Sequence, residues 1–197
     1  IGYPAKLVDA ASWAVPVALD TAGDVDASVY EGNVFEEING KCIDLDGFHH
    51  GVVRRNRCTN SKPLNAYPHA HFGVVFNNTN PFQAPDGIQL VENVISGMKY
   101  GGIFVMGRGH RIAGNELINV NMAGCPESHA TAGCYWIADE PDMLMAGIYL
   151  GKAPMEHTAA PAVGNVVENN RISGKGMPAR CVVTAPGIAT GANVVRG

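Results

Sequence analysis

Short stretches in which apolar and polar residues alternate run along the whole chain, separated by turns that are rich in glycine. The segment 101–118 shows the pattern well: the run IFVM at 103–106 leads into a turn with Gly107 and Gly109, and two more short apolar runs follow. None of these runs is long enough, or periodic enough at about 3.6 residues, to favour a helix, whereas alternation with a period of two is typical of strands. The pattern therefore predicts an all-β protein built from many short strands.

The same unit recurs along the chain, marked by an asparagine with an apolar residue two positions later. The markers are Asn33, Asn56, Asn93, Asn115 and Asn170. Alternating runs that we take as the first strand of each unit lie at 17–20, 43–46, 74–77, 103–106, 148–151 and 181–184. The spacing indicates a repeat of about 22 residues with insertions in two of the units, and about six units in all, the last one incomplete.

A unit of three short strands cannot bury its own apolar face, so we expect the units to stack at the usual strand spacing of about 4.8 Å. Stacking predicts two inward-facing rows. One contains Leu19, Leu45, Phe76, Val105, Leu150 and Val183, and the other contains Val53, Leu90, Ile112 and Val167. We expect the marker asparagines to occupy tight bends in left-handed geometry and to hydrogen-bond to the asparagine of the next unit.

The Gly-Ile-x-Val/Leu strands and the Val-x-x-Asn-x-Ile segments resemble those of the right-handed parallel β-helix, the pectate-lyase-like superfamily, over nearly the whole chain. The resemblance implies an all-β, right-handed, single-stranded parallel β-helix of about six coils, with three short strands per coil and an asparagine ladder at one turn. It implies one domain over residues 1–197. It does not select an activity, because the superfamily hosts lyases, hydrolases, epimerases and non-enzymatic spikes.

Four insertions interrupt the repeat, at 59–70, 78–86, 121–146 and 152–164. All four flank the first strand of their units, where we expect them to form the walls of a groove on that face. The alternative is that loops are simply where insertions are tolerated. Because the chain begins without Met or a signal peptide and ends within a repeat, we interpret it as a piece of a longer chain.

Composition narrows the range of partners. Apolar residues make up 46% of the 197 residues, charged residues only 16%, and the net charge is −4. This balance, without a long basic run, disfavours a nucleic-acid partner. No apolar run approaches the roughly 18 residues of a membrane span.

The five cysteines suggest different roles. We expect Cys58 and Cys181 to be buried free thiols, whereas Cys42, just before a strand, is uninformative. Cys125 and Cys134 share the longest insertion and can close it as a disulfide, which would place the protein in an oxidising compartment: secreted, periplasmic or at the cell surface. A zinc site formed with His129 is an alternative that lacks the usual paired spacing.

The outward positions of the first strands carry the candidate chemistry. One predicted row is Ala18, Asp44, Val75, Phe104, Tyr149 and Val182, and the other is Asp20, Asp46, Asn77, Met106, Gly151 and Thr184. Stacked carboxylates are costly unless they bind a cation, share a proton or are solvated. Asp20, Asp44 and Asp46 therefore predict a catalytic pair for glycoside hydrolysis, or a Ca²⁺ site, or only a solvated polar face.

We therefore predict a carbohydrate-active protein that binds an extended polysaccharide on the first-strand face. Lyase or epimerase chemistry on an acidic polysaccharide is favoured over hydrolysis, because such chemistry needs a cation for the sugar carboxylate and groups that transfer protons near neutral pH. The predicted catalytic residues are Asp44, Asp46, His49, His50 and Arg108, and the predicted substrate-binding residues are Asp20, His71, Asn77, Phe104, His110 and Tyr149. The alternative is a non-enzymatic structural or adhesive β-helix, a spike, surface or filament component that self-associates end to end or stacks on flanking coils.

Overall fold

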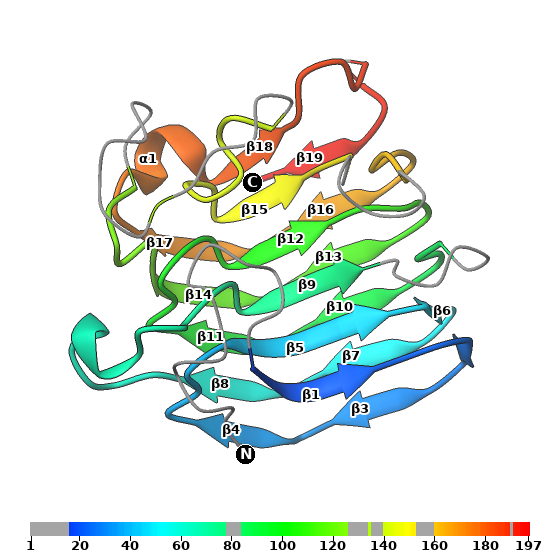
Figure 1. Ribbon diagram of the computed structural model, residues 1–197. Helices are drawn as coiled ribbons and strands as arrows, with labels where there is room; N and C mark the ends of the chain where they lie inside the picture. The colour runs from blue at the N-terminus through cyan, green and yellow to red at the C-terminus, as the bar shows by residue number, and fades with distance from the viewer. Residues whose placement is uncertain (1–15, 78–83, 126–133, 135–139, 153–159, 190) are drawn as a thin grey trace.

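The computed structural model describes residues 16–77, 84–125, 134, 140–152, 160–189 and 191–197. Nearly all the regular structure in these residues is β, in parallel sheets (Figure 1). The exceptions are one short helix, α1 (Met177–Arg180), and a single 3-10 turn at Leu64–Ala66. Among the helices described, none has the length and hydrophobicity needed to cross a membrane.

The first sheet contains one strand from each predicted unit, paired in parallel. Its order is β1 (Val17–Thr21), β5 (Lys41–Asp46), β9 (Val74–Asn77), β12 (Ile103–Val105), β15 (Ile148–Leu150) and β18 (Val182–Thr184). All six first strands expected from the alternating runs are thus confirmed, each within two residues of its expected bounds.

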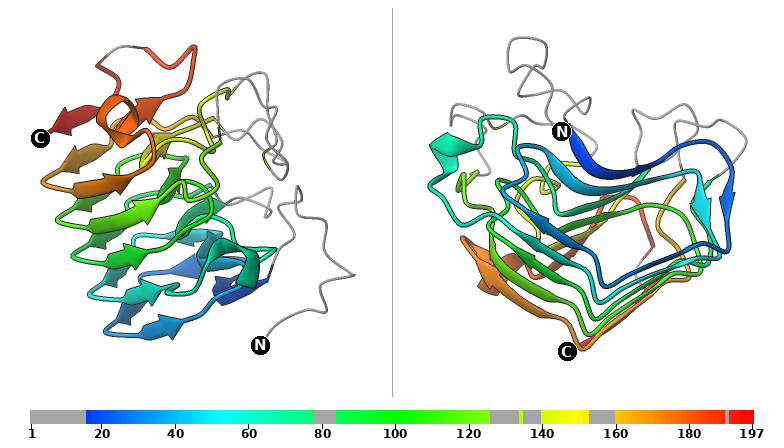
Figure 2. Two further views of the ribbon diagram at one scale, coloured as in Figure 1. Left: turned by 90° about the vertical axis from the view of Figure 1, so that its left-hand side faces the viewer. Right: turned by 90° about the horizontal axis from the view of Figure 1, so that it is seen from below.

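Two further parallel sheets take the strands that follow. The second contains β3 (Val29–Glu31), β7 (Val52–Arg54), β10 (Gln89–Val91), β13 (Arg111–Ala113), β16 (Val166–Glu168) and β19 (Val194–Arg196). The third contains β4 (Val34–Glu36), β8 (Arg57–Thr59), β11 (Val94–Ser96), β14 (Glu116–Val120) and β17 (Arg171–Gly174). A small pair, β2 (Val25–Asp26) and β6 (Phe48–His49), lies between the first and second sheets along the chain. The chain visits the three sheets in turn and then returns to the first, as Figure 2 shows, an arrangement compatible with a parallel β-helix.

The core lies between the sheets, and its rows largely follow the prediction. The row Val53, Leu90, Ile112 and Val167 is confirmed by the strand register. In the first sheet, Leu45, Phe76, Val105 and Leu150 are in register as expected. The two ends of this row were wrong: Thr21, not Leu19, pairs with Leu45, and Thr184, not Val183, pairs with Leu150.

The asparagine ladder is confirmed at the bend between the second and third sheets. Each marker side chain from Asn56 to Asn170 accepts hydrogen bonds, at 2.9–3.0 Å, from the backbone N–H and the side-chain amide of the preceding marker, beginning with Asn33 as the first donor. The expected left-handed geometry falls one residue earlier, however. The residues with positive φ are Gly32, Arg55, Glu92, Gly114 and Asn169, each directly before a marker. The asparagine is needed for its side chain, and the residue before it makes the bend.

The cysteines confirm some expectations and correct others. Cys125 and Cys134 form the expected disulfide, and Cys181 is a free thiol as expected, although it is half-buried rather than buried. Cys58 lies in its expected row beside Ile95 but is not free, because it is bonded to Cys42. The backbone N–H groups of Cys42 and Ile43 both donate to the carbonyl of Gly73, an irregularity that interrupts the alternation and places both side chains in the core.

The four insertions join the first sheet to its neighbours as predicted. They connect β8 to β9, β9 to β10, β14 to β15 and β15 to β16. Residues 78–83, 126–133, 135–139 and 153–159 lie outside the described residues, His129 among them, so the groove walls expected there stay predictions. The alternative of a zinc site is wrong, because Cys125 and Cys134 are bonded to each other and so offer no thiolates to a metal.

The ladder predicts a large effect for Asn93→Ala. Asn93 is buried, accepts two hydrogen bonds from Asn56 and donates to Val53, Val91 and Asn115. Leaving such buried groups without partners costs about 1–3 kcal/mol each, so we expect unfolding free energy to fall by about 3 kcal/mol or more in chemical denaturation. Asn33→Ala is the control, because Asn33 donates to the ladder from a half-buried position at its end, and we expect a loss near 1 kcal/mol. Equal losses for the two variants would contradict the ladder's role.

Candidate functional site

A row of charged side chains lies at the bend between the first and second sheets. Parallel bridges join Asp26 to His49, His49 to Asp86 and Asp86 to Arg108, so four successive repeats each contribute one residue. We call these four residues the charged row; it ends at Val163 in the next repeat. The row has acidic and basic residues in alternation, one step of the strand spacing apart, about 4.8 Å.

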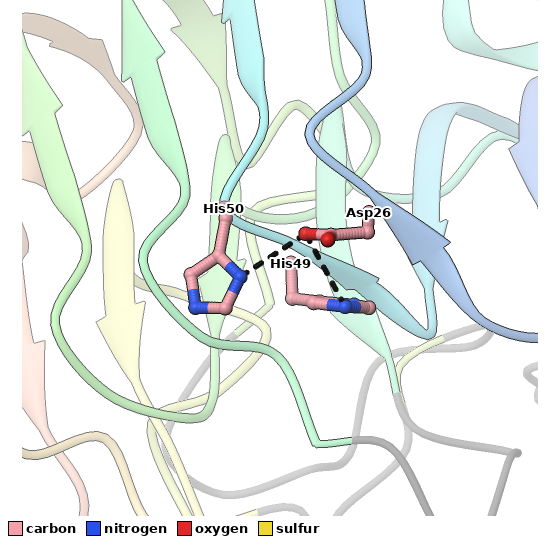
Figure 3. A group of neighbouring side chains, drawn as sticks. All are labelled: Asp26, His49 and His50. Carbon is pink, nitrogen blue, oxygen red and sulfur yellow. Dashed lines mark hydrogen bonds and ion pairs between the residues drawn. The ribbon is translucent and has the colours of Figure 1, made fainter.

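At one end of the row, two histidines meet the carboxylate of Asp26 (Figure 3), and one of them also meets that of Asp24. His49 is buried, and its Nε2 lies 3.3 Å from an oxygen of Asp24 and 3.4 Å from one of Asp26. Its Nδ1 lies 3.2 Å from the carbonyl oxygen of Gly47. The exposed His50 reaches the same Asp26 oxygen with its Nδ1, at 3.1 Å. These contacts bring Asp26, His49 and His50 together as possible metal ligands, the one such group found among the described residues.

At the other end of the row, Arg108 is exposed. Its Nε donates to Asp86 at 3.0 Å. Asp86 and Arg108 also line a surface hollow of about 490 Å³, together with Pro85, Gly107 and Pro161. An exposed pair of this kind contributes little to stability, about 0–1 kcal/mol, so the guanidinium can turn towards an anionic ligand at small cost.

The bend itself is a column of left-handed residues directly after the charged row. They are Ala27, His50, Gly87, Gly109 and Gly164, with φ between 50° and 68°. Three of the five are glycine, the residue for which this geometry carries no steric penalty. His50 therefore occupies a position where the backbone favours glycine, and its side chain is held beside Asp26 by the bend.

Asp44 is not on a solvated face, which corrects the prediction. All six residues of β5 are buried, and the Asp44 carboxylate lies 2.6 Å from the Lys41 ammonium, itself only 2% exposed. Burial raises the pKa of Asp44, against the opposing effect of Lys41, and Asn77 hydrogen-bonds to it. A carboxylate that is already neutralised in this way is poorly placed as an open Ca²⁺ ligand or as a nucleophile for a polymer.

The other two carboxylates are also placed differently from the prediction. Asp20 pairs in register with Asp44, not with Asp46, and burial together with the Asp44 charge raises the pKa of Asp20. Asp46 pairs with Asn77 as expected, but both side chains are buried. The true outward row of the first sheet is Asp20, Asp44, Val75, Phe104, Tyr149 and Val183.

His71 is fully buried and does not face a ligand-binding surface. Burial, followed by the charges of Lys41 and Lys99, holds its pKa well below the usual value. Its ring meets those of Phe72 and Tyr100 edge-on, with centroids 5.3 and 5.1 Å away. These contacts point to a packing role.

Phe104 and Tyr149 are stacked on each other, with centroids 6.1 Å apart and planes at 18°. Both are buried, and Phe104 also packs against Phe72. Burial raises the pKa of the Tyr149 hydroxyl, with a further contribution from Glu140. Neither ring presents a face to solvent, so they are positioned as core residues rather than as a platform for a sugar.

His110 is part of a second ladder at the first bend. Its ring Nδ1 accepts a hydrogen bond from the backbone N–H of Ile88. The backbone N–H of His110 donates to the side-chain oxygen of Asn165, and the backbone N–H of Asn165 donates to the side-chain oxygen of Asn193. Since Nδ1 accepts, Nε2 carries the proton and donates to the carbonyl of Met106 at 2.9 Å. Burial lowers the pKa of His110 to about 4, which keeps this neutral form. His110 is thus placed as a structural residue.

Of the predicted site residues, the structure brings His49, His50 and Arg108 to one bend and places the rest in buried surroundings or beside Asp44. Sequence reasoning missed Asp24, Asp26 and Asp86. The sequence carries a signal for Asp86 alone: like Arg108, it directly precedes a glycine. Asp26 and His49 precede Ala27 and His50, so their place in the row is visible only in the structure.

Comparison of the chain with models of protein families, with curated proteins and with solved structures finds no match. The assignment of a function therefore depends on the geometry of the bend.

The ladder role of His110 predicts a pH-dependent difference between the wild type and His110→Asn. The ordinary pKa of His is 6.5 and the folded value is about 4, so the unfolded chain binds more protons between these values and stability falls as pH falls. We expect this residue alone to account for a loss of about 2–3 kcal/mol between about pH 7 and pH 4.5. His71 adds a loss of the same sign in both proteins.

Asparagine retains an acceptor for the Ile88 N–H, as Asn165 provides one for His110. The variant should therefore fold and show a shallower decline of stability with falling pH, measured as urea midpoints at several pH values. An identical decline in the two proteins would contradict the assignment of a neutral His110.

Proposed function

We propose that the chain forms a right-handed parallel β-helix of about six coils, with three strands per coil, in one domain. The support is the visiting order of the three sheets, the parallel register throughout and the hydrogen bonds of the asparagine ladder between successive repeats. In such a helix, residues at one position of the repeat form straight rows along the axis.

We further propose that the protein binds an extended polysaccharide along the charged row, at the bend beside the first sheet. The observation that carries this proposal is the register of Asp26, His49, Asp86 and Arg108 through consecutive repeats. A straight, regularly spaced row of polar groups suits a linear polymer with repeated hydroxyl and carboxylate groups. The proposed site is thus moved from the face of the first sheet, where Asp44 is buried, to the adjacent bend.

Lyase or epimerase chemistry on an acidic polysaccharide is the activity that this row supports best. Such a reaction needs a cation to neutralise the sugar carboxylate, which the exposed Arg108 supplies. It also needs a group that accepts a proton, a role that the imidazoles of His49 and His50 can take. Hydrolysis by an Asp44–Asp46 pair has less support, because both side chains are buried and Asp44 is paired with Lys41.

We propose a secreted, periplasmic or cell-surface location. The two disulfides, Cys42–Cys58 and Cys125–Cys134, support it, since such bonds persist mainly in oxidising compartments.

A non-enzymatic, self-associating β-helix is the second candidate. The observation in its favour is the exposure of valines on the outermost described strands, Val29 and Val34 at one end and Val194 and Val195 at the other. Those strands pair on one side only within the described part of the chain, and a second copy stacked there would cover these side chains.

Arg108→Ala tests the polysaccharide proposal. In affinity electrophoresis, we expect at least one acidic polysaccharide of a panel to slow the migration of the wild type. We also expect the wild type to release unsaturated uronate products from that polysaccharide, detected by their ultraviolet absorption. The variant should bind about tenfold more weakly, a loss of roughly 1.4 kcal/mol.

Arg111→Ala is the matched control, because Arg111 is also exposed and paired with a carboxylate, Glu168, but lies on the second sheet. Equal effects of the two substitutions would contradict the site. Absence of any binding, together with a mass in light scattering that rises with concentration, would favour the self-associating alternative.

A further inference from the structure

Four side chains from two adjacent repeats converge at the start of the charged row, in the arrangement shown in Figure 3 for three of them. β2 and β6 hold them in place: Asp26 and His49 are register partners, and the N–H of Val25 donates to the carbonyl of Gly47. Asp24 precedes β2, and His50 follows β6. The donors are two imidazoles and two carboxylates.

The distances between these donors match those around a small metal ion. Bonds of about 2.0–2.1 Å in tetrahedral geometry place neighbouring ligand atoms about 3.3–3.4 Å apart. His49 Nε2 lies 3.3 Å from Asp24 and 3.4 Å from Asp26, and His50 Nδ1 lies 3.1 Å from Asp26. The ligand atoms of Asp26, His49 and His50 all lie within 4.8 Å of one another.

The orientation of His49 is that of a metal ligand. Its Nδ1 faces the carbonyl of Gly47, which can only accept, so Nδ1 carries a proton in any state of the ring. The lone pair of the neutral ring is then on Nε2, directed at the two carboxylates. Electron pairs on nitrogen and oxygen repel unless a proton or a metal ion lies between them. A backbone carbonyl that fixes the tautomer through the far nitrogen is the usual second partner of a ligating histidine.

His50 occupies a left-handed backbone position, a conformation that favours glycine. Its φ is 50°; the equivalent residue of the preceding repeat is Ala27, with a φ of 51°, and those of the next three repeats are Gly87, Gly109 and Gly164. A left-handed residue with a side chain costs about 1–2 kcal/mol. The His50 side chain contacts Asp26 from this left-handed backbone position. Because the ring is exposed, its burial does not offset the conformational cost of that position.

We propose that Asp24, Asp26, His49 and His50 bind a divalent transition-metal ion of the zinc type. Imidazole nitrogens together with carboxylate oxygens suit Zn²⁺, Co²⁺ and related ions. Ca²⁺ is disfavoured, because it takes six to eight oxygen ligands, and half of the donors here are nitrogens. The inference concerns one end of the row and has its own measurement. While His49 and His50 ligate the ion they do not accept protons, so the inference replaces that role, whereas binding of an anionic polymer at Arg108 does not depend on it.

Calorimetric titration of Zn²⁺ into the chelator-treated chain tests the site, in a Cys181→Ser background that removes the free thiol. We expect one ion per chain. His49→Gln should weaken binding about tenfold or more, the effect typical of a lost ligand or its support. Co²⁺ should give the visible absorption of a tetrahedral complex, and excess Ca²⁺ should not displace it.

His50→Gly separates a ligand from a structural residue. It removes a donor but relieves the left-handed backbone, so we expect weakened Zn²⁺ binding with a melting temperature that is unchanged or raised. Asp86→Asn is the control: it removes a carboxylate of the same row that pairs with Arg108, and it should bind Zn²⁺ as the wild type does. Absence of saturable binding, or equal binding by the His49 and His50 variants and the wild type, would overturn the proposal and leave an ion pair of a protonated His49 with the two carboxylates.

Discussion

One asparagine side chain per repeat links each bend between the second and third sheets to the next. Its side-chain oxygen accepts two hydrogen bonds from the neighbouring repeat, and its side-chain NH₂ group donates to backbone carbonyls. The bend lies outside the strand ladders, and these bonds take the place of strand pairing there. The buried backbone groups at this bend would otherwise lack partners, at a cost comparable to a lost hydrogen bond each. Because the side chains of Asn56, Asn93 and Asn115 must meet, the repeats are locked in register, and the strands on either side follow.

The charged row is a consequence of the same register at the other bend. A left-handed residue turns the chain there too, and the residue before it is brought beside its counterpart in the next repeat. The hydrogen bonds beneath this bend come from His110, Asn165 and Asn193. The positions of the charged row are therefore not needed for these hydrogen bonds and can carry side chains that bind a ligand. The contrast between a neutral, buried His110 and the His49–His50 pair beside two carboxylates shows how one scaffold gives histidines different roles.

Much of the fold could be predicted from the sequence, because it depends on local features that repeat. The alternating first strands and the marker asparagines are visible directly, and both were confirmed. The irregularity at Gly73 was not visible. It lets Cys42 and Ile43 both face the core, and so brings Lys41 onto the same side as Asp44, although residues three apart would point to opposite faces of a regular strand. This single departure explains both the unexpected Cys42–Cys58 disulfide and the buried, neutralised Asp44. Asp24, Asp26 and Asp86 escaped prediction because insertions and bends of unequal length hide the alignment of the first bend.

The central claim is that residues at one position of the first bend are neighbours along a row. Cross-linking tests it most directly, in a Cys181→Ser chain that carries D86C and R108C. Bridged positions in adjacent parallel strands lie within the separation of about 4.4–6.8 Å that a disulfide requires, so we predict that oxidation closes a bond between these two positions, seen as the loss of both thiols in mass spectrometry. The control pair D86C and E116C, on the first bend and the third sheet, should keep both thiols. Two free thiols in the first pair, or equal cross-linking in both pairs, would contradict the account.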